Sequence, residues 1–159
     1  MSVSITVEMP KKELKSMPPE IRDIVVPKAL NQLALNTYHD VIQHAPRRTG
    51  ALIGSIVRNV SKTGFSIAPT VSYAIFVSSG TRAHLITPRT PFGVLAFETG
   101  DAFFGVGGET VFTRRVRHPG TRPNPYIENA YRRMNESCPG IFEEAYKEYM
   151  DEIMKGEKK

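Results

Sequence analysis

The sequence predicts an α+β fold in which helices pack on a mainly antiparallel sheet. Residues 3–7 alternate apolar and polar side chains, as a half-buried strand does. Residues 27–45, and again those after Pro125, repeat apolar side chains at steps of three and four, the spacing of an amphipathic helix. Between these helices the chain is rich in Val, Leu, Ile, Phe and Thr and is divided by glycine and proline, which favours several short strands.

The long N-terminal helix is the clearest of these elements. Pro27 has no backbone N–H and suits a helix start, so we expect a short turn from Glu20 and the main helix from about Pro27. Pro46 ends the helix, because the residue before a proline avoids the helical region. The apolar stripe consists of Leu30, Leu33, Ala34, Tyr38, Val41, Ile42 and Ala45.

The middle of the chain predicts two blocks of strands. The first block has strands at residues 53–60, 64–68 and 71–77, with a hairpin turn at residues 62–64. The second block is a β-rich insertion over residues 83–117, with strands at 83–88, 93–98 and 109–117. Within it, residues 100–108 combine glycines with Phe103 and Phe104, which predicts a mobile loop that carries two aromatic side chains.

The C-terminal region predicts a second helix. Apolar residues from Ile127 to Met134 share one face, Pro139 and Gly140 interrupt the pattern, and the stripe resumes at Ile141. Residues 155–159 are charged and predict a flexible tail. Because 159 residues suit one hydrophobic core, we expect a single domain over residues 1–159.

Composition narrows the class of protein. The formal net charge is +5 and the pI is about 9.4, which permits contact with nucleic acid or with an acidic protein surface. Residues 126–159 differ from this average, with six basic and eight acidic residues. No run approaches the ~18 apolar residues of a membrane helix, so we expect a soluble chain with no membrane partner. Cys138 is the single cysteine, which excludes an internal disulfide.

Catalytic and metal-binding patterns are weak. His39 and His44 are five residues apart and lie on different faces of their helix, and His84 and His118 meet only if their strands pair. We interpret the histidines as structural, and Ser78 lacks the glycine pattern of a nucleophile elbow. We therefore expect no enzyme, no metal and no cofactor.

Three short segments stand out instead, each at the boundary of a predicted element. The first runs from residue 45 to 56, the second from 73 to 82, and the third from 118 to 126. Each combines glycine with proline, serine or threonine and with basic residues, as turns do.

In this order the three segments resemble the neck, or head–tail joining, proteins of long-tailed phages: the gene-product-ten family of siphovirus-type tails. The resemblance covers residues 20–135. The matching residues are Pro46, Thr49, Gly50, Leu52, Ser55 and Ile56 in the first segment; Tyr73, Ala74, Val77, Gly80 and Thr81 in the second; and His118, Pro119, Gly120, Thr121, Pro125, Tyr126 and Ala130 around the third. The chain departs from the family at Ile53, where arginine is usual, and at Ser78 and Ser79, where the family has an acidic residue.

The resemblance implies a structural virion protein. Such subunits form a ring between the head connector and the tail tube, DNA passes through the ring, and the protein is needed for head–tail joining or tail completion. Implied partners are further copies of the chain, connector proteins, tail-tube or terminator proteins, and duplex DNA held without sequence specificity. The implied location is the virion neck, after assembly in the host cytoplasm. A ring needs contacts that close on themselves, so we expect the insertion, with Phe103 and Phe104, to reach a neighbouring subunit.

Arginines cluster around the same segments, and two roles for them stay open. They contact DNA phosphates in the channel, or they pair with acidic faces of neighbouring subunits, which we favour because DNA must slide through the ring. These arginines are Arg47, Arg48, Arg82, Arg89, Arg114, Arg115, Arg117 and Arg122. The alternative function is that of a small basic nucleic-acid-binding α+β protein, which would use the same side chains.

Overall fold

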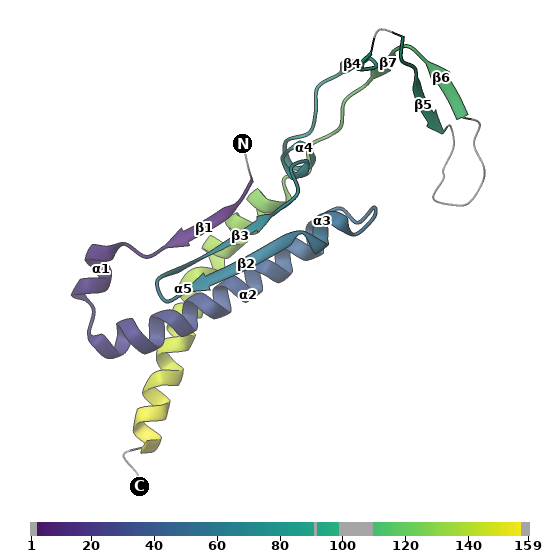
Figure 1. The fold of residues 1–159 in the computed structure, drawn as a ribbon. Coiled ribbons are helices and arrows are strands. Elements are labelled where there is room, and N and C mark those ends of the chain that lie inside the picture. Colours follow the sequence, from purple (N-terminus) through teal and green to yellow (C-terminus); the bar gives the residue numbers. More distant parts are fainter. Residues whose placement is uncertain (1–2, 91, 99–109, 157–159) are drawn as a thin grey trace. The chain divides into compact units, whose positions relative to one another are not determined.

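A computed structural model describes residues 3–90, 92–98 and 110–156. The chain forms two compact units (Figure 1). The first unit contains the described residues up to Ser79 and those from Asn124 onward, and the second unit is Gly80–Pro123. The expected insertion, residues 83–117, lies within the second unit, which also includes the residues on either side of it.

The first unit contains a three-stranded sheet with the order β1, β3, β2. The strands are β1 (Ile5–Glu8), β2 (Ile56–Ser61) and β3 (Gly64–Pro69), and both pairs are antiparallel. Ile5 lies opposite Ile67, and both side chains are buried, so this face of the sheet covers the core. The predicted hairpin turn joins β2 to β3, and a β-carbon at Gly64 would collide with the carbonyl oxygen of Val7.

The N-terminal helix covers this sheet. The short helix α1 (Lys11–Ser16) precedes one turn of π-helix, η1 (Ile21–Val25), which continues without a break into α2 (Val26–His44). Pro27 lies in the first turn of α2, directly after η1, so it removes one backbone donor within a continuous helical stretch instead of starting a separate helix. The predicted stripe is buried along α2 and packs on β2 and β3, which confirms the main helix of the α+β fold.

The second long helix, α5 (Tyr126–Gly156), packs along α2. The predicted interruption at Pro139 is wrong, because α5 continues through it. The buried residues Ile127, Ala130, Met134, Ile141 and Ala145 keep steps of three, four and seven on both sides of the proline, so one face remains against the core. Of the predicted flexible tail, Lys155 and Gly156 belong to α5 instead, and residues 157–159 lie outside the described residues.

One predicted strand is helical instead, and another begins later than expected. Residues 51–54 form the short helix α3 (Ala51–Gly54), so the strand predicted from residue 53 begins at Ile56. Residues 74–79 form α4 (Ala74–Ser79), where a strand was predicted over 71–77. The burial pattern fits a helix: Ala74 and Ser78 are buried, whereas Phe76 between them is 59% exposed, although a strand would place all three on one face.

The second unit consists of two antiparallel ribbons. One pairs β4 (His84–Ile86) with β7 (Val116–His118), and the other pairs β5 (Leu95–Glu98) with β6 (Thr110–Thr113). The strand predicted over residues 109–117 is therefore two strands. Between them Thr113 Oγ1 accepts a hydrogen bond from the backbone N–H of Arg115 and donates one to its carbonyl oxygen, which bends the chain.

Burial differs sharply between the two units. Among the described residues, the hydrophobic side chains that are buried all belong to the first unit. Among the described residues from Gly80 to Pro123, none is buried. No helix in the described part of the chain is long and apolar enough to cross a membrane.

Candidate functional site

The first family-like segment forms the turn between α2 and the sheet. Gly50 has a φ of +78°, in the left-handed region that glycine adopts readily, and its carbonyl accepts the N–H of Gly54 at 2.9 Å. Leu52 is buried, and the Ser55 hydroxyl donates to the Leu52 carbonyl at 2.7 Å. Thr49 is exposed, with its Oγ1 3.4 Å from the backbone nitrogen of Ala51. The segment thus fixes the entry into β2.

The first and second segments meet in the first unit. Tyr73 and Val77, from the second segment, face Thr49 and Leu52 of the first across a cavity of about 380 Å³. Tyr73 is partly exposed, whereas Ala74 is buried. The full lining is Pro46, Arg48, Thr49, Gly50, Leu52, Tyr73 and Val77. The structure therefore brings these two segments together, although residues 57–72 separate them in sequence.

The second segment is also joined to the start of α5. Ser78 is 2% exposed, and its Oγ lies 2.8 and 2.9 Å from the two carboxylate oxygens of Glu128. The N–H of Asn124 donates to the Val77 carbonyl at 3.0 Å. The Ser78 hydroxyl thus joins the second segment to the first turn of α5 through the Glu128 carboxylate.

Tyr126 is the buried residue at the start of α5. Its side chain is 0% exposed, and its hydroxyl has no hydrogen-bond partner among the described residues. Burial raises the pKa of the Tyr126 hydroxyl, and the nearby Glu128 and Tyr73 raise it further. Burial likewise raises the pKa of the Cys138 thiol, so neutral pH keeps this thiol protonated and poorly nucleophilic.

The second and third segments meet again at the base of the second unit. Thr81 and Thr121 exchange two backbone hydrogen bonds of 3.1 Å each, and their hydroxyls lie 3.0 Å apart. Gly80 and Gly120 precede them, with φ values of +70° and +89°. A β-carbon on Gly80 would lie 2.5 Å from the Thr121 carbonyl oxygen, and one on Gly120 would collide with that of Thr81. We call these four residues the Gly-Thr clasp.

His118 and Pro119 lead into this clasp. The N–H of Gly120 donates to His118 Nδ1 at 3.0 Å. His84 lies opposite His118 in the β4–β7 pair, with ring centroids 5.0 Å apart, and its Nδ1 donates to the Arg82 carbonyl at 2.9 Å. The histidines therefore do meet, held by turn hydrogen bonds. No cluster of three or more His, Cys, Asp or Glu that could hold a metal occurs in the described part of the chain.

The predicted arginines are all exposed. Arg47 and Arg48 lie in the turn after α2, in the first unit. Those of the second unit are Arg82, Arg89, Arg114, Arg115, Arg117 and Arg122. Within the described residues, no salt bridge involves any of these eight.

Large apolar side chains lie among these arginines. Phe92 is 94% exposed and Phe112 is 66% exposed, and Leu85 and Val94 are also exposed. Sequence reasoning missed Phe92 and favoured Phe103 and Phe104, which lie outside the described residues. The position of Phe92 between Pro91 and Gly93 is the signal for an exposed turn residue.

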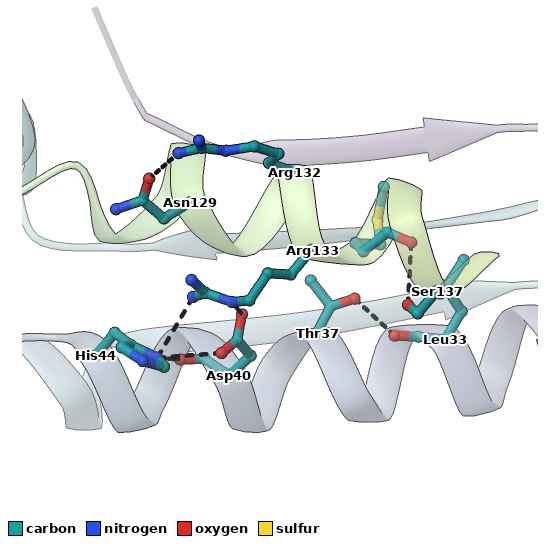
Figure 2. A network of polar contacts seen from close by, with 9 residues as sticks. Leu33, Thr37, Asp40, His44, Asn129, Arg132, Arg133 and Ser137 are labelled. Atoms are coloured by element: carbon teal, nitrogen blue, oxygen red, sulfur yellow. Dashed lines mark hydrogen bonds and ion pairs between the residues drawn. The ribbon is translucent and has the colours of Figure 1, made fainter.

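A polar contact between the two long helices was also missed (Figure 2). Arg133 of α5 donates from Nε to Asp40 Oδ2 at 2.8 Å, and His44 Nδ1 lies 3.0 Å from the other carboxylate oxygen. On the buried side of α2, Thr37 donates to the Leu33 carbonyl at 2.7 Å, which satisfies its hydroxyl. Arg133 to Asp40 and Lys28 to Glu148 together show that α2 and α5 run antiparallel.

Comparisons of the chain with protein-family models, with curated proteins and with solved structures found no match.

Proposed function

We propose that this chain is a structural subunit of the neck of a long-tailed phage. Copies form a ring between head connector and tail tube, DNA passes through the ring, and the ring serves head–tail joining or tail completion. Its partners are further copies of the chain, the connector, and tail-tube or terminator proteins. It acts in the virion neck and assembles in the host cytoplasm.

The observation that carries the proposal is the second unit, which exposes large apolar side chains and buries none of its described residues. Two-stranded ribbons are at best marginally stable in water by themselves. Contiguous exposed apolar patches are typical of surfaces that meet another protein. A subunit that is completed by its neighbours has this character, whereas an enzyme or a free-standing binding domain buries the core of each part.

The family-like residues support the proposal by what they do locally. Thr49, Gly50, Leu52, Tyr73 and Val77 line one cavity in the first unit. The clasp of Gly80, Thr81, Gly120 and Thr121 closes the base of the second unit. These residues order turns and element boundaries within each unit, which suits a structural protein better than a reaction site.

The test replaces exposed aromatic residues of the second unit with serine. The variant F92S/F112S removes two side chains that contribute nothing to the core, so thermal unfolding should stay within about 0.5 kcal/mol of the wild-type protein. We expect the oligomer to dissociate, as measured by sedimentation velocity. F76S, which removes an exposed phenylalanine of the first unit, is the matched control and should leave assembly unchanged. Normal assembly of F92S/F112S would contradict the proposal.

A second candidate function is non-specific nucleic-acid binding, because six exposed arginines lie in one unit with Phe92 and Phe112. A protein that neutralises six phosphates loses about a thousandfold in affinity between about 50 and 200 mM salt. Fluorescence anisotropy with duplex and single-stranded DNA at the two salt concentrations tests this. Tight, steeply salt-dependent binding by a monomer would favour this second function over the neck.

A further inference from the structure

The C-terminal half of α5 carries an apolar ridge that the first unit leaves open. Tyr146, Met150, Ile153 and Met154 are exposed and follow helical spacing, so they lie along one side of the helix. Ile141 and Ala145, on another side of the same helix, are buried in the core. We call these four exposed residues the α5 ridge.

The helix around this ridge is acidic. Residues 139–156 contain five carboxylates and two lysines. Glu148 lies 2.9 Å from Lys28 and Glu152 lies 3.6 Å from it, so these two belong to the contact with α2. Glu143 pairs with Lys147 at 2.7 Å. Glu144 and Asp151 are exposed and form no salt bridge within the described part of the chain.

The second unit is basic, in contrast to the acidic helix around the α5 ridge, and it also exposes apolar side chains among its charged ones. Residues 80–123 contain six arginines and three acidic residues. Leu85 lies directly opposite Arg117 in the β4–β7 pair, so an exposed apolar side chain and a guanidinium share one face of the ribbon. Phe112 lies next to the turn that carries Arg114.

We propose that the second unit of one copy docks on the α5 ridge of the next copy, with arginines set against the carboxylates beside the ridge. The proposed occupant of the α5 ridge is a second copy of this chain, because the two surfaces have complementary charges. The second unit is basic and exposes apolar side chains, and the helix around the α5 ridge is acidic and exposes apolar side chains. Because the two surfaces differ, the contact is heterologous, and repetition around a rotation axis closes a ring. The inference rests on the proposed neck function and names the surfaces that build its ring.

Charge reversal on each surface tests the contact. R114E/R117E reverses the charge of two side chains in the second unit, and E144K/D151K reverses the charge of two side chains on the helix that carries the α5 ridge. None of the four residues is buried or forms a salt bridge with a described residue, so both variants should fold normally by circular dichroism. Each alone should weaken self-association at least tenfold in sedimentation velocity. The control K11E/K12E changes net charge as R114E/R117E does, on the exposed residues of α1, and should assemble normally.

Mixing the two variants identifies the partner. In a one-to-one mixture the two variants can alternate around the oligomer. The reversed second unit of R114E/R117E then meets the reversed ridge of E144K/D151K, and the native second unit of E144K/D151K meets the native ridge of R114E/R117E. Oligomers should therefore reappear. A chain with all four changes should also assemble. Recovery in the four-change chain without recovery in the mixture would place the contact within one chain and overturn the proposal.

Other outcomes separate this inference from the proposed function. If the wild-type protein and all variants form the same rings, the interface is wrong and the ring function stands. If R114E/R117E loses only binding to duplex DNA, the arginines face nucleic acid and the inference is overturned. If the wild-type protein stays monomeric at every concentration, the self-assembling function fails and the interface fails with it.

Discussion

Thr81 and Thr121 lie 40 positions apart, yet each donates its backbone N–H to the carbonyl of the other at 3.1 Å. Each follows a glycine with positive φ, and each glycine lies against the carbonyl of the opposite threonine. The Gly-Thr pairs of the second and third segments are therefore two halves of one clasp. This explains why glycine and threonine occur together at both ends of the second unit.

The clasp predicts that alanine is poorly tolerated at Gly80 and Gly120. The left-handed backbone costs an L-residue about 1–2 kcal/mol, and the collision with a carbonyl adds to it. Such a cost raises the population of the opened clasp about 5–30-fold. Trypsin should then cleave after Arg82 faster by a similar factor in G80A and G120A, whereas the Arg122–Pro123 bond resists trypsin.

Gly140 provides the control for the clasp variants. It lies within α5, and a β-carbon there would meet nothing within 4 Å. G140A should stabilise the protein by about 0.5–1 kcal/mol, since alanine is a better helix former. Wild-type cleavage rates in both G80A and G120A would show that the clasp does not hold the second unit.

Ser78 predicts a second, local effect on stability. A hydrogen bond to a charged group contributes about 1.5–3 kcal/mol, and Glu128 is exposed, so S78A should cost about 1.5 kcal/mol in urea unfolding. S79A, one residue along and exposed, should change stability by less than about 0.5 kcal/mol. Equal effects of S78A and S79A would contradict the assigned contact with Glu128.

Tyr126 predicts a dependence on alkaline pH. Its hydroxyl has no hydrogen-bond partner among the described residues, so Y126F should keep the stability of the wild-type protein, or exceed it, at pH values near neutral. The folded state raises the pKa of Tyr126, so the wild-type protein loses stability as pH rises above the ordinary tyrosine value of about 10.

Y126F lacks this titration, and the difference between the two proteins should grow in its favour as pH rises. Chemical denaturation in steps from pH 8 to pH 11 measures it. A loss above about 1 kcal/mol in Y126F at pH 8 would mean that the hydroxyl has a partner.

The Arg133–Asp40 pair predicts a modest coupling between α2 and α5. Both side chains are partly exposed, so a double-mutant cycle with D40N and R133Q should give about 0.5–1 kcal/mol. Salt should reduce this coupling, because water reaches the pair. A coupling of zero at low salt would mean that the ion pair contributes nothing and that packing alone holds α2 and α5 together near Asp40 and Arg133.

The sequence predicted the elements whose periodicity is long. Leu30 and Leu33 belong to an apolar stripe over residues 30–45, and Ile5 to a clear alternation, so α2, β1 and the α+β class are confirmed. Short segments were less predictable. Residues 71–77 look like a strand because Val71, Ile75 and Val77 favour strands. The segment is helical, and burial of Ala74 and Ser78 with Phe76 exposed between them fits a helix and not a strand.

The candidate site was predicted as separate turns and not as an assembly. Local sequence shows that Gly80 and Gly120 need positive φ, but it carries no signal that Thr81 pairs with Thr121. The same holds for Ser78 and Glu128, which lie 50 residues apart. The interruption predicted at Pro139 was wrong because proline removes only one backbone hydrogen bond of the helix. The buried apolar residues before and after Pro139 pack on the same core, and this packing keeps α5 continuous.

The most direct test of the ring-forming role is the mass of the wild-type protein over a wide concentration range, with negative-stain images of the same samples. The neck proposal predicts a shift with concentration from monomer to one closed oligomer, seen as rings with a central hole wide enough for duplex DNA. A strict monomer at every concentration, with no rings in the images, would contradict it.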